Sequence, residues 1–264
     1  MNKLLPLVLS LGCAYGTQFG PNSPQGTAEE TDIQDKYALI VVGSSDIGNY
    51  YGIPQSQNPF YIDGVMIRDR LEQNGFKREN IHFLHGADAS YAKLTETAVE
   101  LSRKVDGNDA FVAVISTHGT PFALELEADS QMMRSGQLED AIEKIRPKVG
   151  FLYIDACYSG SIVRDLDLPN YVRVSSTESG TPAYSSTEFS GARNYLKALF
   201  DEGSDANKDG RVTFAEAFMA SNESAERYQA GLNSQMADMA SFEQQMYYGD
   251  NASPYENLGP YRGE

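Results

Sequence analysis

The stretch VGFLYIDACYSG, residues 149–160, decides how this chain of 264 residues folds. Its apolar run is typical of a strand that is buried on both faces, as strands of parallel sheets are. The run ends in an acid, a cysteine and several small residues. The chain contains only two cysteines, so the position of Cys157 directly after a buried strand points to a use for its thiol.

Other segments extend this pattern along the chain. Buried strands are predicted over 37–45, 80–86, 109–119, 149–160 and 170–180, and amphipathic helices over 62–76, 93–105 and 135–147. Strands that alternate with helices predict an α/β fold with a parallel sheet covered on both faces. Such sheets carry their chemistry at the carboxyl ends of their strands. Those ends hold Ser44 and Ser45, then His118 and Gly119, then residues 157–160.

Cys157 and His118 are the candidate nucleophile and its acid–base partner. They are 39 positions apart, and each follows an apolar strand. If the two strands are neighbours, both side chains emerge at one edge, where an imidazole can activate a thiol. The N–H groups of Gly119 and Cys157 would then form an oxyanion hole. An inert buried cysteine and a histidine that caps a strand are the alternative.

Three blocks, VVGSS, VISTHG and IDACYSGS, stand in this order and resemble the caspase-like superfamily of cysteine peptidases, most closely its legumain branch. The resemblance covers about residues 37–200. It implies a caspase-like three-layer sandwich with a mostly parallel central sheet flanked by helices. It also implies that Cys157 is the nucleophile, that His118 is the general acid and base, and that the substrate is a peptide or protein.

The same resemblance implies a substrate cleft. Asp155 would point into the S1 pocket, and Ser175 and Ser176 would run beside the substrate backbone. Ser45 stands where legumains carry an asparagine thought to orient the histidine, which leaves a third catalytic residue open. The basic residue that legumains carry after the first strand is missing here, so Asp155 would favour Arg or Lys at the P1 position. A polar strand end bonded to the backbone is the alternative role for Asp155.

The stretch DANKDGRVTFAE, residues 205–216, matches the EF-hand loop pattern at every constrained position. Calcium prefers oxygen ligands, and the loop offers them at the required spacing. The predicted ligands are Asp205, Asn207, Asp209, the carbonyl of Arg211, and Glu216. Segments 192–203 and 214–228 on either side are predicted helices. A single loop favours a structural calcium that holds these helices to the catalytic domain; an acidic turn that binds no ion is the alternative.

The N-terminal sequence MNKLLPLVLSLGC has a lysine, a short apolar run and a small residue before Cys13, as a secretory signal has. Cys13 also resembles a lipoprotein acceptor cysteine, so membrane attachment through a lipidated Cys13 is one alternative and simple export is another. Residues 14–35 are rich in Gly, Pro, Ser, Thr and acids, which predicts a flexible linker. The formal net charge of −16 argues against a nucleic-acid partner.

These features divide the chain into a signal (1–13), a linker (14–35), a peptidase domain (36–200) and a helical extension with the EF-hand-like loop (201–264). Beyond residue 225 the Met and Phe positions predict one more helix, with its methionines in the core. The predicted function is an exported, calcium-stabilised cysteine endopeptidase that works through a thioester, with transpeptidation as a variant. A catalytically inactive calcium-binding or adhesive envelope domain is the alternative. The sequence does not define the oligomeric state.

Overall fold

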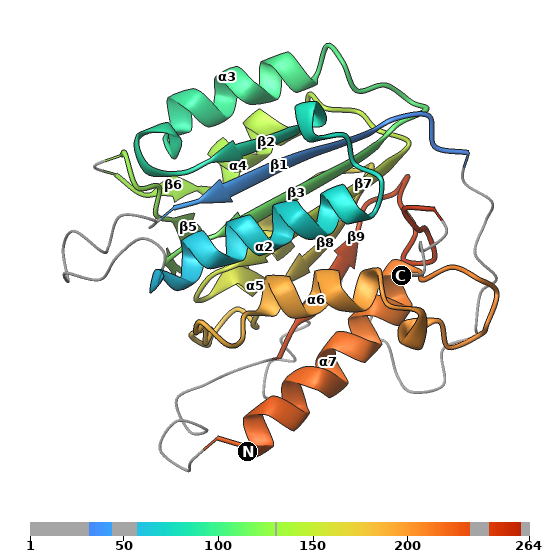
Figure 1. Cartoon of the computed structure of the whole chain (residues 1–264). Helices are drawn as coiled ribbons and strands as arrows, with labels where there is room; N and C mark the ends of the chain where they lie inside the picture. Colours follow the sequence, from blue (N-terminus) through green and yellow to red (C-terminus); the bar gives the residue numbers. More distant parts are fainter. Residues whose placement is uncertain (1–31, 44–56, 130, 233–242, 260–264) are drawn as a thin grey trace, which may run out of the picture.

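A computed structural model describes residues 32–43, 57–129, 131–232 and 243–259. Its centre is a six-stranded sheet with the order β2-β1-β3-β7-β8-β9 (Figure 1). The strands are β1 (Lys36–Val42), β2 (Ile81–Leu84), β3 (Ala110–Ser116), β7 (Val149–Asp155), β8 (Tyr171–Ser175) and β9 (Gln245–Tyr248). The first five run parallel, and β9 pairs antiparallel with β8 at the edge of the sheet.

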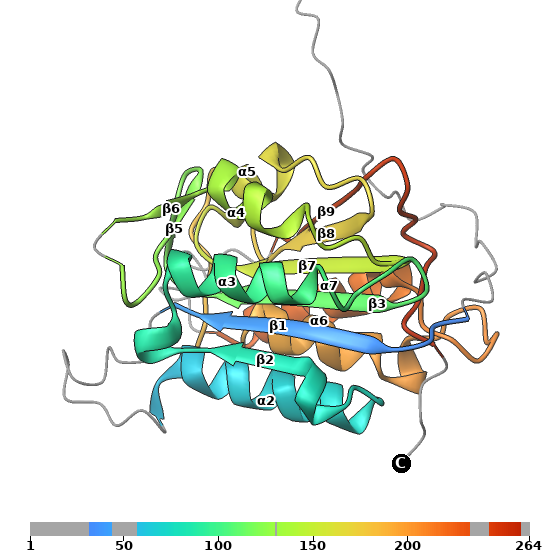
Figure 2. The ribbon, with the colours of Figure 1, turned by 90° about the horizontal axis from the view of Figure 1, so that it is seen from above.

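Helices cover both faces of this sheet, which confirms the predicted three-layer sandwich (Figures 1 and 2). One face carries α3 (Tyr91–Leu101), α4 (Ser135–Ile142) and α5 (Ser159–Asp165). The opposite face carries α2 (Pro59–Gln73), α6 (Gly191–Leu199) and α7 (Phe214–Ala230). Within the described ranges, every helix is too short or too polar to span a membrane.

The two-sided cover explains why the strands are continuous apolar runs. In β1, Leu39 and Val41 face α3 and its neighbours, whereas Ala38, Ile40 and Val42 face α2 and α6. Side chains alternate between the faces of a strand, so a strand covered on both sides has no solvent-facing position left for polar residues. Burial of each such Leu, Ile or Val side chain stabilises the folded chain by roughly 1.5–3 kcal/mol.

Local signals set where the helices begin. Pro59 occupies the first turn of α2, and the side chain of Asn58 accepts hydrogen bonds from the N–H groups of Phe60 and Tyr61 at 3.0 and 3.3 Å. Ser90 caps α3 in the same manner. These caps satisfy donors that have no partner inside the helix. They also place the start of α2 close to the carboxyl end of the sheet.

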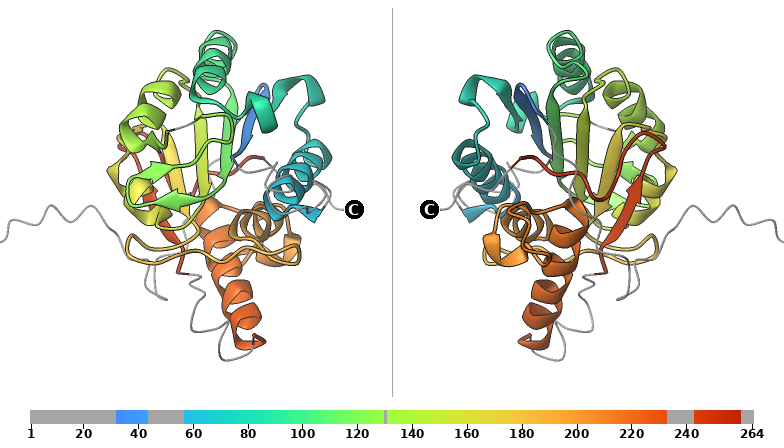
Figure 3. Two further views of the ribbon diagram at one scale, coloured as in Figure 1. Left: turned by 90° about the vertical axis from the view of Figure 1, so that its left-hand side faces the viewer. Right: turned by 90° about the vertical axis from the view of Figure 1, so that its right-hand side faces the viewer.

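A second, small sheet extends from the carboxyl end of the large one. It consists of β4 (Gly119–Thr120), β5 (Ala123–Leu124) and β6 (Met133–Arg134), paired antiparallel in that order. Figure 3, left panel, faces this end of the molecule. The chain therefore leaves β3, passes His118 and turns directly into the small sheet.

The structure differs from the predicted elements in several places, and the strand predicted over 170–180 ends at Ser175. The strand predicted over 149–160 ends at Asp155, because Tyr158 turns the chain with a φ of 59° and α5 begins at Ser159. The predicted helical extension is wrong at residues 245–248, which form the strand β9 of the main sheet. Met246 is buried in the core, as predicted. Met236 and Met239 lie outside the described residues.

Candidate active site

The strands that precede His118 and Cys157 are neighbours in the sheet. β3 and β7 pair in parallel, with Ser116 opposite Asp155. The N–H of Thr117 continues the ladder by donating to the carbonyl of Asp155 at 3.0 Å. Ser116 and Asp155 are 39 positions apart, the same separation as His118 and Cys157. The register therefore brings the histidine and the cysteine to the same edge at the same level.

Gly119 lies directly against the Cys157 backbone. A Cβ atom on Gly119 would lie 2.3 Å from the carbonyl oxygen of Cys157 and 3.1 Å from the Cβ of Ala156. Such distances are far below van der Waals contact, so only glycine fits here without movement. The absent side chain is what allows the segment after β3 to approach the segment after β7 this closely.

Cys157 occupies the turn between β7 and α5. The left-handed conformation of Tyr158, at φ 59°, reverses the chain immediately after the thiol. The sulfur is half-buried and lies 3.8 Å from the carbonyl oxygen of Ala183. In the part of the chain that the structure describes, no acceptor is bonded to the N–H of Cys157. The thiol thus sits on a tight turn at the end of the strand, within reach of solvent.

The His118 side chain is exposed, and one face of it is fixed by an aromatic contact. Phe60, in the first turn of α2, meets the imidazole in an edge-on arrangement with ring centroids 4.9 Å apart. Gly43, which follows β1, packs on the same segment, because a Cβ on Gly43 would lie 2.1 Å from the hydroxyl of Thr117. Sequence reasoning did not single out Phe60, since its position depends on how α2 docks.

Asp155 is buried just below this edge, with 3 % of its surface exposed. One carboxylate oxygen accepts a hydrogen bond from the N–H of Ala192, in the first turn of α6, at 2.8 Å. Burial raises the pKa of the Asp155 carboxyl, and the bonds from Ala192 and Ser176 and the nearby Arg193 oppose that rise. The carboxylate is thus bound to a helix start beneath the site.

Ser175, the last residue of β8, and Ser176, which follows it, are also buried. The N–H of Ala156 donates to the Ser176 hydroxyl at 3.2 Å, which ties the end of β8 to the residue before Cys157. The Ser175 side chain is fully buried, and its hydroxyl has no partner within the described ranges. Ser44 and Ser45 lie outside the described residues.

A second acid, Asp63 of α2, approaches Asp155 from the neighbouring helix. It is completely buried and forms an ion pair of 2.6 Å with Arg193 of α6. Burial raises the pKa of Asp63 to about 7, and repulsion from Asp155 adds to the rise while Arg193 opposes it. The sequence carries a signal for this acid that was missed: Asp63 shares the buried stripe of Ile67 and Leu71 at four-residue spacing.

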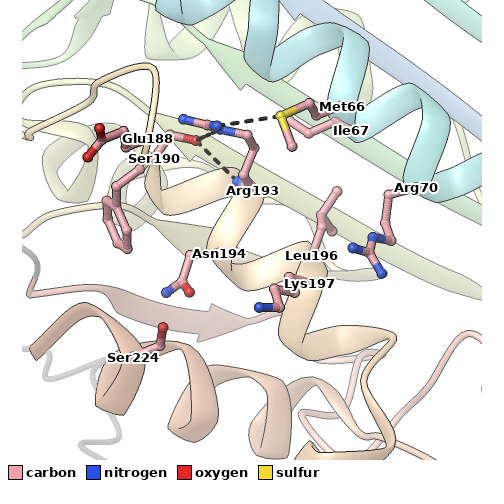
Figure 4. Close-up of a pocket in the computed structure, with 11 residues that line it drawn as sticks. Met66, Ile67, Arg70, Glu188, Ser190, Arg193, Asn194, Leu196, Lys197 and Ser224 are labelled. Carbon is pink, nitrogen blue, oxygen red and sulfur yellow. Dashed lines mark hydrogen bonds between the residues drawn. The ribbon is translucent and has the colours of Figure 1, made fainter. Parts of the chain in front are cut away.

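A pocket of about 270 Å³ lies between α2, α6 and α7. Figure 4 shows its residues, with the Arg193 guanidinium directed toward Met66 and Ser190. Neither Cys157 nor His118 lines this pocket. It is a separate feature that borders the helix start on which Asp155 is bound.

The segment predicted to bind calcium, residues 205–216, forms a tight turn closed by its own side chains. It connects α6 to α7 after a short 3₁₀ turn, and Gly210 adopts a φ of 87° at the position where the pattern requires glycine. Asp205 accepts bonds from the N–H groups of Asp209 and Gly210, and Asn207 accepts from Asp209 at 2.9 Å. These bonds hold the loop in a closed ring.

The acidic side chains of this loop are turned toward its backbone. The Glu216 carboxylate accepts from the N–H groups of Ala206 at 3.1 Å and Thr213 at 2.9 Å, and it caps α7. Asp209 accepts from the N–H of Arg211 at 3.0 Å. Among the residues that the structure describes, no three His, Cys, Asp or Glu side chains converge on a point that could hold a metal ion. Calcium binding therefore stays a prediction.

A parallel sheet with a cysteine and a histidine at one edge is an arrangement that a cysteine peptidase can use. A family model described as the peptidase C13 family matches residues 96–263, more than half of the chain and both strand ends of the site. The chain belongs to the peptidase C13 family. A search of curated proteins finds no match. The family supports the resemblance to legumains that the three sequence blocks indicate.

Proposed function

We propose that the chain is a cysteine endopeptidase in which Cys157 is the nucleophile and His118 is the general acid and base. Membership of the peptidase C13 family supports the class of enzyme. The shared register of β3 and β7, which brings both residues to one edge, supports the choice of residues. This register is the single observation on which the proposal depends most.

The chemistry follows from the groups at this edge. The Cys157 thiolate adds to the peptide carbonyl, and the N–H groups of Cys157 and Gly119 stabilise the oxyanion. His118 gives its proton to the leaving amine as the C–N bond breaks, which leaves a thioester on the sulfur. Water then adds with His118 as base, and the acid product and the thiolate separate. An amine in place of water gives transpeptidation.

Labelling with a peptidyl acyloxymethyl ketone tests the assignment. We expect one label per folded chain, no label on Cys157→Ala, and a labelling rate about 10²–10⁴-fold lower for His118→Ala. His82→Ala, on the remote strand β2, is the matched control and should label normally. A folded wild-type chain that takes no label contradicts the proposal and favours an inactive binding domain.

A preference for Arg or Lys at P1 is part of the proposal. Asp155 lies two residues before the nucleophile, and a cationic side chain that approached it would favour its ionised form. A peptide library with varied P1 residues tests this preference. Selectivity for basic residues should fall in Asp155→Asn, and an unchanged selectivity contradicts the role of Asp155.

We also propose that calcium binds the loop 205–216 and stabilises the α6–α7 pair. The hard oxygen donors and the turn at Gly210 support it, and binding requires Glu216 to rotate away from the backbone N–H groups. Added calcium should raise Tm in the wild type and leave the Tm of Glu216→Gln unchanged. Magnesium is the control ion. An equal response of both proteins to calcium contradicts the assigned ligands.

Export, with or without a lipid on Cys13, remains part of the proposal on the basis of the sequence of residues 1–13. Labelling of producing cells with a radioactive fatty acid separates the two alternatives. A lipid-linked chain loses the label in Cys13→Ala, and a simply exported chain is never labelled. A wild-type chain that stays inside the cell contradicts export.

A further inference from the structure

One loop contacts the proposed nucleophile from the side of α6. This wall loop, residues 176–190, runs from the end of β8 to the start of α6. The carbonyl of Ala183 lies 3.8 Å from the Cys157 sulfur, and the N–H of Tyr158 donates to the carbonyl of Thr181 at 2.9 Å. The position of the wall loop therefore determines the shape of the space beside the thiol.

The end of the wall loop that lies away from the thiol is bonded to Arg193 and also packs on α7, where the Phe189 ring stacks on Tyr228 with ring centroids 4.5 Å apart. Arg193 donates to the carbonyl of Ser186 at 2.6 Å and to the carbonyl of Thr187 at 3.1 Å. Its Nε also approaches the hydroxyl of Ser190, which caps α6 (Figure 4). Carbonyl oxygens in loops usually face water. Because two carbonyls of the wall loop bind one guanidinium instead, Arg193 restrains this part of the loop.

Arg193 is itself held from the other direction by Asp63. Its Nε lies 2.6 Å from the Asp63 carboxylate, and only 11 % of the Arg193 side chain is exposed. The second oxygen of Asp63 accepts from the hydroxyl of Ser116 at 3.1 Å. Ser116 is the last residue of β3, two positions before His118. The contacts thus run from the strand end that carries the histidine, through Asp63 and Arg193, to the wall loop.

We propose that Arg193 is a positioning residue for peptide hydrolysis, which fixes the wall loop beside Cys157 by joining Asp63 to the carbonyls of Ser186 and Thr187. This inference rests on the proposed function of Cys157. Only arginine provides a planar fork with enough donors for a carboxylate and two carbonyls at once. A lysine at position 193 keeps the charge but offers one compact ammonium group, which cannot reach all three acceptors.

The variant Arg193→Lys separates positioning from folding. The ammonium group still neutralises Asp63, so the chain should fold, but the wall loop loses the paired bonds from Arg193 to the carbonyls of Ser186 and Thr187. We expect kcat for a peptide to fall about 10- to 100-fold, because small displacements of a substrate-contacting wall are costly, with a smaller change in KM. Alkylation of Cys157 by iodoacetamide needs no wall loop and should stay within about twofold of the wild type.

Arg70→Lys is the matched control, because Arg70 lines the same pocket from α2 and only its backbone carbonyl, not its guanidinium, is hydrogen-bonded to a described side chain, that of Asn74. Its kcat should equal that of the wild type. A second test variant, Asp63→Asn with Arg193→Gln, removes both members of this ion pair together, so that neither member is left without the other. When folded, it should show the same loss of kcat with normal alkylation.

These results separate the positioning role of Arg193 from the proposed function of Cys157. Wild-type kcat in folded Arg193→Lys overturns the positioning role, as do equal losses of turnover and alkylation. Unfolding of both test variants assigns Arg193 a purely structural role and also overturns it. Peptide turnover that persists in Cys157→Ala overturns the proposed function instead, whatever Arg193→Lys does.

Discussion

Asp63 is the residue whose titration should be visible in the stability of the whole chain. Its pKa in the folded chain is about 7, because burial and Asp155 raise it more than Arg193 lowers it. The unfolded chain releases this proton near pH 4. Between these two pH values only the folded state holds the proton on Asp63. The stability that this proton adds to the folded chain is therefore fully present below pH about 4 and is lost as the pH rises through about 7.

The expected result is a larger fall in Tm between pH 5 and pH 8 for the wild type than for Asp63→Asn. The difference is on the order of 2 kcal/mol, about 5 °C for a chain of this size. Asp69→Asn, exposed on the same helix, should behave as the wild type. Parallel melting curves over this pH range check the prediction, and equal slopes for wild type and Asp63→Asn would contradict it.

Gly119 shows how one absent side chain can determine a site. In Gly119→Ala the new Cβ must move away from the Cys157 carbonyl, which lies 2.3 Å from its ideal position. A shift of about 1 Å should lower kcat/KM on the order of 10²-fold, and the strain should cost about 1–3 kcal/mol. Gly136→Ala, in open space on α4, is the control and should keep full activity. Normal kinetics for Gly119→Ala contradict the assigned contact.

At the scale of elements, the start of α2 links stability to the site. Asn58→Ala removes the side chain that accepts from Phe60 and Tyr61, and should cost about 1 kcal/mol. Because Phe60 packs on His118, the same change should also lower kcat. Ser90→Ala removes the equivalent cap of α3, far from the site, at a similar cost in Tm. A kcat for Asn58→Ala as high as that for Ser90→Ala contradicts the proposed contact.

The elements that the sequence predicted well are those with strong local patterns. Apolar periodicity, together with capping residues or with Gly and Pro at the ends, marks the five parallel strands and most of the helices. The exception among the helices is α5. α5 was missed because its small residues continue the apolar run of β7, and only the left-handed Tyr158 separates them. β9 was missed because its role depends on pairing with β8, which no local pattern records.

The candidate site divides in the same way. Strand-end residues such as His118 and Cys157 follow from the order of strands, since neighbouring parallel strands end at one edge. The partners that hold them do not. Phe60 and Arg193 reach the site through the docking of α2 and α6, and Asp63 looks like a surface acid unless its place on the buried stripe is noticed. Tertiary packing decides these positions.

At the scale of the whole molecule, the net charge of −16 should influence the encounter with substrates. A negative field attracts cationic peptides and is screened by salt. We expect kcat/KM for a peptide with several Lys or Arg residues to fall on the order of threefold or more as salt rises from about 0.02 M to about 0.2 M. An uncharged peptide of the same length is the control. An equal response of both peptides contradicts steering by charge.

The pairing of β8 with β9 has a consequence for the order of assembly. Ser175 and Gln245 are register partners, yet α6, the loop 205–216 and α7 all lie between them along the chain. Joining ends so far apart costs more loop entropy than joining consecutive strands. The parallel strands and their crossover helices can therefore nucleate first, and the edge closes late. Backbone amides of β9 should be the last of the sheet to gain protection from hydrogen exchange during refolding.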